Sequence, residues 1–235
     1  MSTPDGSHLL IDAGNLSAGH RVRQYLKNRQ IAVLDAVIIT HMHPDHVGGL
    51  FALAPNLTIK MLYDHGDIRK DDVFGNQYIR LANHLGVQRT VLGAGDALSF
   101  GRVEMQVLSP ARPPAGDMNA DSIVLKISYE KVSFLLAADL NAAGEKRLLG
   151  KKLDLRSHVL KVGHHGANDA TSESFLEAVR PLHAVISAGT DNPLLYPGEG
   201  TLELLKRAKV NVMRTDRDGT IIVKTDGHSL SIERE

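Results

Sequence analysis

The sequence predicts an α/β protein with two similar halves that pack sheet on sheet, with helices on the outside. Strand-like and helix-like periodicities alternate along all 235 residues. Hairpin signals are too frequent for one doubly wound parallel sheet. The Pro- and Gly-rich segment 110–119 lies near the midpoint, and we expect it to be a connection inside a single domain spanning 1–235.

In the first half, strands are expected at three short apolar runs, 8–12, 34–40 and 57–63. The run 34–40, LDAVIIT, is rich in β-branched residues, as is typical of a strand buried on both faces. Apolar residues at helical spacing predict helices over 18–30 and 71–85. Short strands interrupted by glycines are expected between 88 and 109.

The second half repeats this mixture of elements. Residues 122–139 predict two strands around a tight turn at Tyr129–Lys131. Further strands are expected at 157–163, 183–189, 210–214, 219–224 and 228–232. Helices are expected at 141–150, 172–180 and 199–208. Both halves end strands in polar side chains, which suits ligands gathered at a sheet edge.

Composition excludes several classes of protein. Cysteine is absent, so disulfides and thiolate zinc sites are excluded. The 27 Lys and Arg residues balance 27 Asp and Glu residues, which argues against general electrostatic binding to nucleic acid or membrane but leaves room for a local basic patch. No apolar run approaches the ~20 residues of a membrane-spanning helix, and the N-terminus does not have the pattern of a signal peptide. We therefore expect a cytoplasmic protein without a membrane segment.

The stretch THMHPDHVGG places three histidines and an aspartate within six positions. His41 and His43 share one side of an extended segment because side chains alternate there. A proline then stiffens the turn, so that Asp45 and His46 address a neighbouring point. Imidazoles and carboxylates are good ligands for Zn²⁺, Mn²⁺ and Fe²⁺. The alternative is a histidine-rich surface loop that binds no metal.

One loop cannot close two metal sites, so further ligands are expected at other strand ends. Asp139 ends the apolar run VSFLLAAD, where it is either a ligand or the N-cap of the helix at 141–150. His164 and His165 follow a predicted strand and precede a glycine, which favours a site over a structural role. We expect His164 to be the ligand and His165 either to support the ligands from behind or to face the substrate.

The motifs on which a family resemblance rests run through the chain. THMHPDHVGG matches the His-x-His-x-Asp-His signature of the metallo-β-lactamase superfamily, and LLIDAGN is similar to its first motif. MNADSIVLKISYEKVSFLLAADL, VLKVGHHGA and AVISAGTDNPLLYPGEGTLELLKRAKVNVMRTDRDGTI together resemble the soluble ComEC-like hydrolase domain attached to a DNA-uptake channel protein. The resemblance covers nearly the whole chain.

The resemblance implies a four-layer αββα sandwich with two divalent metal ions, Zn or Mn, at one edge of the sheets. It implies these ligands: His41 and His43 for the first metal, Asp45, His46 and His164 for the second, and Asp139 for both. Asp12 is implied to orient the histidine loop from behind. A hydroxide held between the metals would attack the substrate, with Asp45 orienting this nucleophile.

Three departures from the family pattern carry further expectations. No histidine precedes the strand at 122; Asp121 stands there and is expected to be an oxygen ligand or to hold a water, unless it is only a turn residue. Tyr196 replaces a substrate-facing histidine, and its phenol can donate a hydrogen bond to a bound oxyanion. The strand that normally precedes the TPDG turn is missing, so an exposed N-terminal sheet edge is expected, through which the chain could form an oligomer.

The predicted function is that of a metal-dependent hydrolase, with phosphodiesterase or nuclease activity favoured on a small-molecule or nucleic-acid phosphodiester. One alternative is hydrolysis of carbonyl substrates such as a lactone, thioester or β-lactam, and another is a non-catalytic binding descendant of the fold. The relatively oxygen-rich first site favours manganese slightly over zinc. The basic stretches KKLDLR and KRAK are typical of solvated faces, although a basic rim would suit a phosphate-bearing substrate.

Overall fold

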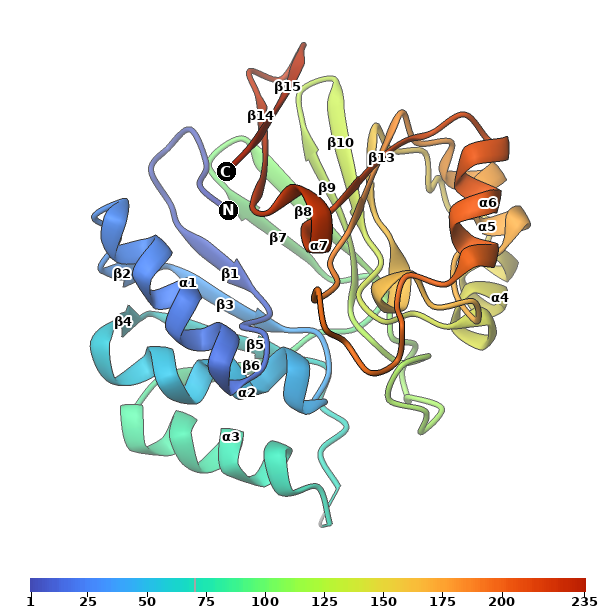
Figure 1. The fold of residues 1–235 in the computed structure, drawn as a ribbon. Helices are drawn as coiled ribbons and strands as arrows, with labels where there is room; N and C mark the ends of the chain where they lie inside the picture. The colour runs from blue at the N-terminus through green and yellow to red at the C-terminus, as the bar shows by residue number, and fades with distance from the viewer. Residues whose placement is uncertain (70) are drawn as a thin grey trace.

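The computed structural model describes residues 1–69 and 71–235, and most of their strands belong to two facing sheets (Figure 1). The first sheet is parallel, with the order β1-β3-β5-β6. Its strands are β1 (Leu9–Ile11), β3 (Ala36–Ile39), β5 (Met61–Asp64) and β6 (Gln88–Val91). All four residues of β3 are buried, as predicted from the β-branched run, because sheet and helix cover its two faces. The strands β2 (Val33–Leu34) and β4 (Thr58–Ile59) form a separate short pair.

Three helices cover the outer face of this sheet: α1 (Leu16–Asn28), α2 (Pro44–Leu53) and α3 (Val73–Leu85) (Figure 1). Glycines let α1 and α2 approach closely, since a Cβ atom on Gly19 would lie 2.4 Å from the Gly49 carbonyl oxygen. Gly49 is the last glycine of the THMHPDHVGG stretch. This close crossing fixes α2, and with it the histidine loop at the start of α2, against the sheet.

The second sheet is mixed, with the order β13-β12-β11-β10-β9-β8-β7. Its strands are β7 (Ala97–Phe100), β8 (Val103–Ser109), β9 (Val124–Tyr129), β10 (Val132–Leu136), β11 (Val159–Lys161), β12 (His183–Ile186) and β13 (Asn211–Arg214). The predicted tight turn joins β9 to β10, and β10 to β13 run parallel to one another. The helices α4 (Ala142–Gly150), α5 (Glu173–Val179) and α6 (Glu199–Arg207) lie on its outer side (Figure 1).

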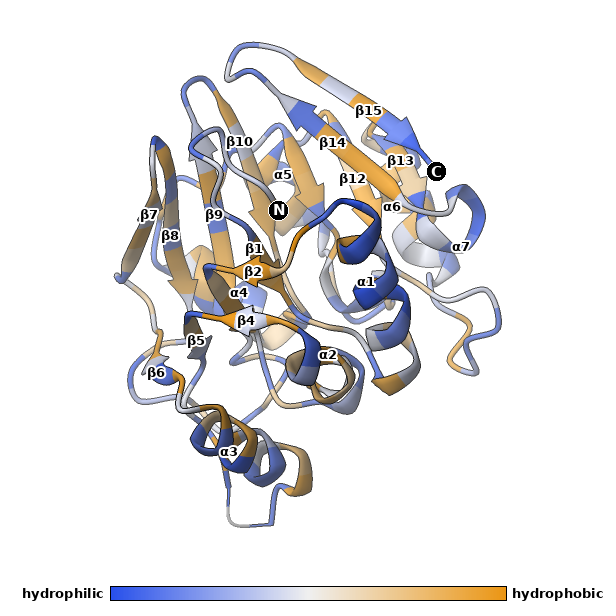
Figure 2. Ribbon diagram, turned by 90° about the vertical axis from the view of Figure 1, so that its left-hand side faces the viewer, coloured by the Kyte–Doolittle hydropathy of each residue, from blue (hydrophilic) through white to orange (hydrophobic). Residues whose placement is uncertain are grey.

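A hydrophobic core joins the inner faces of the two sheets. It includes Leu9 and Ile38 from the first sheet and Met105 and Ile127 from the second. Figure 2 shows that strands of the second sheet are mainly hydrophobic, whereas the exposed side of α1 is hydrophilic. Helices therefore enclose two apposed sheets, and the predicted αββα order of layers is confirmed.

Each end of the chain pairs with a strand of its own half or hairpin. After the short helix α7 (Thr215–Asp218), β14 (Ile221–Thr225) and β15 (Leu230–Arg234) form an antiparallel hairpin. At the N-terminus, Ser2 bridges His8, and the Met1 carbonyl accepts from the Leu9 amide at 2.8 Å. The chain's own first residues thus cover part of the outer edge of β1, so the expected exposed edge is smaller than predicted; oligomerisation through it stays a prediction. Within the described residues, no helix has the length and apolar character needed to cross a membrane.

Candidate metal centre

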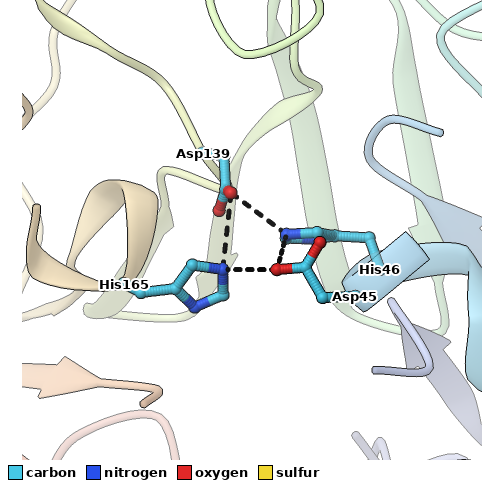
Figure 3. A group of neighbouring side chains, drawn as sticks. All are labelled: Asp45, His46, Asp139 and His165. Atoms are coloured by element: carbon cyan, nitrogen blue, oxygen red, sulfur yellow. Dashed lines mark ion pairs between the residues drawn. The ribbon is translucent and has the colours of Figure 1, made fainter. Parts of the chain in front are cut away.

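The predicted ligands meet at one edge of the sandwich, where β3, β10 and β11 end. His41 follows β3 after a single residue, and Asp139 lies in the loop after β10. His165 lies in a short 3-10 turn, Gly163–Gly166, directly after β11. Because these elements reach the edge from both sheets, side chains far apart in the sequence point to one place (Figure 3).

The first group consists of His41, His43 and Asp139, whose candidate ligand atoms lie within 4.8 Å of one another. His41 Nε2 is 2.9 Å from His43 Nδ1 and 3.9 Å from Asp139 Oδ2. His41 and Asp139 are buried, while His43 is half-buried. Two imidazole nitrogens and a carboxylate oxygen therefore face one point.

The second group consists of Asp45, His46, Asp139 and His165, again within 4.8 Å (Figure 3). The Oδ2 atom of Asp139 is 3.1 Å from His46 Nε2 and 3.4 Å from His165 Nε2. Asp45 Oδ2 is 3.2 Å from His165 Nε2. Asp139 thus belongs to both groups. The alternative role of Asp139 as a helix cap is wrong, because Asn141 caps α4 by accepting from the Gly144 amide.

The donor atoms of these groups fit a divalent cation. Among the described residues, His46 Nε2, His165 Nε2 and Asp139 Oδ1 are buried and make no hydrogen bond. Buried polar atoms without partners are costly, and ones that converge on a point are the arrangement expected of metal ligands. Nitrogen and carboxylate donors suit Zn²⁺ and Mn²⁺.

Asp12, at the end of β1, holds the histidine loop from behind. Its carboxylate accepts from the backbone N–H and the hydroxyl of Thr40, both at 2.8 Å. Its Oδ2 also lies 2.7 Å from His46 Nδ1. This contact assigns the Nδ1 proton to the Asp12 side of the ring and leaves Nε2 directed at the second group.

His165 is oriented in the same manner. Its Nδ1 lies 2.8 Å from the carbonyl oxygen of Ser187, to which it donates when protonated. His164 instead turns away, with Nδ1 2.9 Å from Asp169 and Nε2 3.3 Å from the Asn119 amide nitrogen. The structure therefore brings His165 into the group, whereas the sequence-based preference was for His164. The reason is local backbone geometry, because both histidines have a positive φ, 44° and 53°.

Asp121 lies outside both groups. It is buried, its Oδ1 is 3.1 Å from Arg147, and its Oδ2 accepts from the amides of Gly116 and Asp117. These contacts organise the loop before β9. Asp121 therefore has the position of a turn residue, which was the alternative to a role as metal ligand. Asn119 instead contacts His164, and its buried Oδ1 has no hydrogen-bond partner among the described residues.

Tyr196 lies beside the centre. Its ring is nearly parallel to that of His165, with centroids 6.4 Å apart, and its centroid is 5.6 Å from that of His164. Partial burial raises the pKa of the phenol, aided by the nearby negative charges of Asp169 and Asp139. The hydroxyl therefore keeps its proton and is able to donate a hydrogen bond.

The carboxylates of the centre control its electrostatics. Burial lowers the pKa of His46, but Asp12 and Asp139 outweigh this effect and raise it to about 10. At His165, burial also lowers the pKa, but Asp139 and Asp45 outweigh this effect and raise the pKa to about 9. Burial lowers the pKa of His41 well below its usual value. His46 and His165 therefore carry protons at neutral pH, and a bound cation would replace their positive charge.

Sequence reasoning missed Lys161, at the end of β11. Its Nζ atom is buried and makes no hydrogen bond with any described residue. Its charge acts to lower the pKa of His165, so it lies near the centre. A lysine inside the apolar run VLKVG was the available signal, since lysine is rarely buried without a partner.

Comparisons with known proteins agree with this geometry. The model of the metallo-beta-lactamase superfamily matches residues 3–190. ComE operon protein 3 of Bacillus subtilis is 34% identical over 200 residues, which cover 84% of this chain and 25% of that protein. Recombination protein 2 of Haemophilus influenzae is 32% identical over 242 residues, which cover 98% of this chain and 28% of that protein. The chain thus spans about a quarter of the length of these relatives.

Solved structures share the fold. The crystal structure of Zn²⁺-bound PqqB from Methylobacterium extorquens has a TM-score of 0.56 and 14% sequence identity, and the match covers 90% of this chain and 83% of that one.

Proposed function

Because the chain belongs to the metallo-β-lactamase superfamily, we propose that residues 1–235 form one domain that hydrolyses phosphodiester bonds with two divalent metal ions. The observation that carries this proposal is the pair of His and Asp groups that share Asp139. Two adjacent metals are a common solution for phosphodiester hydrolysis, because both the attacking and the leaving oxygen need stabilisation. Zinc in the fold relative PqqB and the nitrogen-rich donor set make zinc or manganese the expected ions.

The proposed ligands follow the two groups. His41 and His43 would hold one ion, Asp45, His46 and His165 the other, and Asp139 both. When bound, the ions supply an activated water and polarise the substrate's phosphoryl oxygen. We assign the second site to His165 rather than His164 because only the His165 Nε2 atom faces the group.

Three side chains would have roles in the reaction beyond holding the metal ions. Asp45 is about half exposed, with 52% of its side chain accessible, so its carboxylate can orient the attacking water from the open side. Tyr196 can donate its hydroxyl hydrogen to a phosphoryl oxygen. Asp12 keeps the His46 ring in one tautomer and orientation.

A phosphodiester is favoured over a carbonyl substrate by the two curated relatives. Their names refer to a ComE operon and to recombination, and recombination acts on nucleic acid. Since this chain matches only about a quarter of each, the substrate class is part of our proposal.

The test uses the purified chain reconstituted with Zn²⁺ or Mn²⁺. We expect hydrolysis of bis(p-nitrophenyl) phosphate, a loss of at least about 100-fold in kcat/KM for Asp139→Ala, and no change for His20→Ala on the surface of α1. Parallel assays use a lactone, a thioester and a β-lactam. Turnover of one of these with no phosphodiester cleavage would refute the proposed substrate class, and a metal-loaded protein inactive on all of them would refute catalysis.

A further inference from the structure

A groove of about 590 Å³ runs along β13, the edge strand of the second sheet. Its walls come from α6, α7 and the end of β15, which Figure 1 shows around β13. Five of its lining side chains are cationic: Lys206, Lys209, Arg214, Arg217 and Arg234. Asp218 is its one lining carboxylate among the described residues. In a chain with no net charge, this is a local concentration of positive charge.

Most of this charge is not neutralised within the chain. Arg214 pairs with Asp216, and Arg234 lies 3.5 Å from Asp218. Lys206, Lys209 and Arg217 are exposed, and no carboxylate of the described residues lies within 4.0 Å of their cationic groups. Three free cations along one groove can therefore bind an anionic ligand with several charges.

One end of the groove, at Arg214 and Arg217, lies on the same side of the second sheet as the metal centre. The strands β11, β12 and β13 are parallel neighbours, so their C-terminal ends lie in a row. His165, just after β11, has its Nδ1 atom 2.8 Å from the carbonyl oxygen of Ser187, which directly follows β12. The next residue after β12, Ala188, donates its backbone N–H to the hydroxyl of Thr215, which directly follows Arg214 at the end of β13. Two strand spacings amount to about 10 Å, so an extended ligand in the metal centre can reach the Arg214 end of the groove. Lys206 and Lys209 precede β13, so the rest of such a ligand would follow this strand toward its N-terminal end.

We propose that the groove binds the phosphate backbone of a single-stranded nucleic acid while another phosphodiester of the same strand lies in the metal centre. This inference rests on the proposed function and adds the surface that would hold the rest of the substrate. A basic groove that follows a backbone is the common means of binding single strands without sequence preference. Its volume, about 590 Å³, is that of a small-ligand site and accommodates part of one strand.

The test compares two substrates on the metal-loaded protein. The groove variant is Lys206→Gln/Lys209→Gln/Arg217→Gln. Its control, Lys146→Gln/Lys152→Gln/Arg156→Gln, removes three exposed cations that do not line the groove. Circular dichroism and metal content establish that both variants fold and load. kcat/KM is measured on a single-stranded oligonucleotide and on bis(p-nitrophenyl) phosphate, which is too small to reach the groove.

We expect the groove variant to lose at least about 10-fold in kcat/KM on the oligonucleotide and less than about 2-fold on the small substrate. The slope of log affinity against log salt should fall by about 2, since three contacts at ~0.7 each are lost. The control variant should change neither. Equal losses on both substrates, or no loss on the oligonucleotide, would overturn the proposal.

Binding of the oligonucleotide, followed by fluorescence anisotropy, separates this inference from the proposed function. If the parent protein binds the oligonucleotide and the groove variant does not, the groove is established even where no phosphodiester is cleaved. If a poly-glutamate peptide of equal charge competes as well as the oligonucleotide, the groove is a site for acidic proteins and the inference is wrong.

Discussion

The Oδ2 atom of Asp12 lies 2.7 Å from the Nδ1 atom of His46, 34 residues later in the chain. The same carboxylate accepts two hydrogen bonds from Thr40. Asp12 therefore fixes the residue before His41 as well as the ring of His46, and it connects both proposed metal sites to β1.

This contact predicts the behaviour of Asp12→Ala. The ring of His46 loses its fixed orientation, so we expect metal affinity to fall by about 10–100-fold, the usual effect of removing such a partner. Isothermal titration with Zn²⁺ measures the affinity. Asp35→Ala, which removes a carboxylate at the far end of β1, is the control and should leave it unchanged. Equal affinities for the parent and Asp12→Ala would show that His46 is held by other contacts.

The two adjacent histidines after β11 should differ in effect. His165→Ala removes a nitrogen that faces Asp45 and Asp139, so we expect the second metal equivalent to be lost or bound at least about 10-fold more weakly. His164→Ala should retain both equivalents, because its ring is occupied by Asp169 and Asn119. Mass spectrometry of the loaded proteins counts the metal. The reverse pattern would restore His164 as the ligand.

The metal-free protein should become less stable as pH rises. The folded pKa of His46, about 10, lies above the unfolded value of 6.5, so its stabilising contribution is complete below pH 6.5. That contribution is lost as pH rises through the folded pKa. Urea unfolding of chelator-treated protein at pH 6.5 and pH 9.5 should therefore give a smaller free energy of unfolding at the higher pH. His46→Gln should flatten the dependence; an unchanged slope would mean that His46 is not its source.

How far the centre could be predicted depends on the backbone. His41, His43, Asp45 and His46 were predictable because a strand end and a helix start place them within one short motif. Asp139 was predictable because it ends a buried apolar run. His165 was not, since two successive residues with positive φ reverse the alternation expected after a strand.

Long-range contacts set the other limit. Asp121 was a candidate ligand by its position, but its partner Arg147 comes from α4 and becomes a neighbour only in the folded chain. The basic groove likewise joins Lys206, Arg217 and Arg234 from separate elements. The KRAK stretch of the sequence contains only two of the groove's cations, Lys206 and Lys209. The layers of the fold, by contrast, followed from periodicity and from the family resemblance.

Away from the centre, Asp64 should be a major source of stability. It is fully buried, and its carboxylate accepts from Arg89 at 2.5 and 2.7 Å and from the Tyr78 hydroxyl at 3.1 Å. Asp64→Ala leaves the Arg89 charge without a partner, so we expect a loss of about 3–5 kcal/mol in the free energy of unfolding. Metal content should not change.

The matched control breaks the exposed pair of Lys60 and Asp35. Lys60→Ala should cost no more than about 1 kcal/mol, because solvent screens that pair. Denaturant unfolding measures both variants. Similar losses for the two would contradict the assignment of Asp64 as a buried anchor of the first sheet.

The most direct test of the account is the number of metal ions bound per chain, with and without Asp139. Both groups share this carboxylate, so the parent protein should bind two equivalents of Zn²⁺ or Mn²⁺ after reconstitution and dialysis. Asp139→Ala should retain at most one. A parent protein that binds one equivalent or none, or an Asp139→Ala variant that keeps two, would contradict the account.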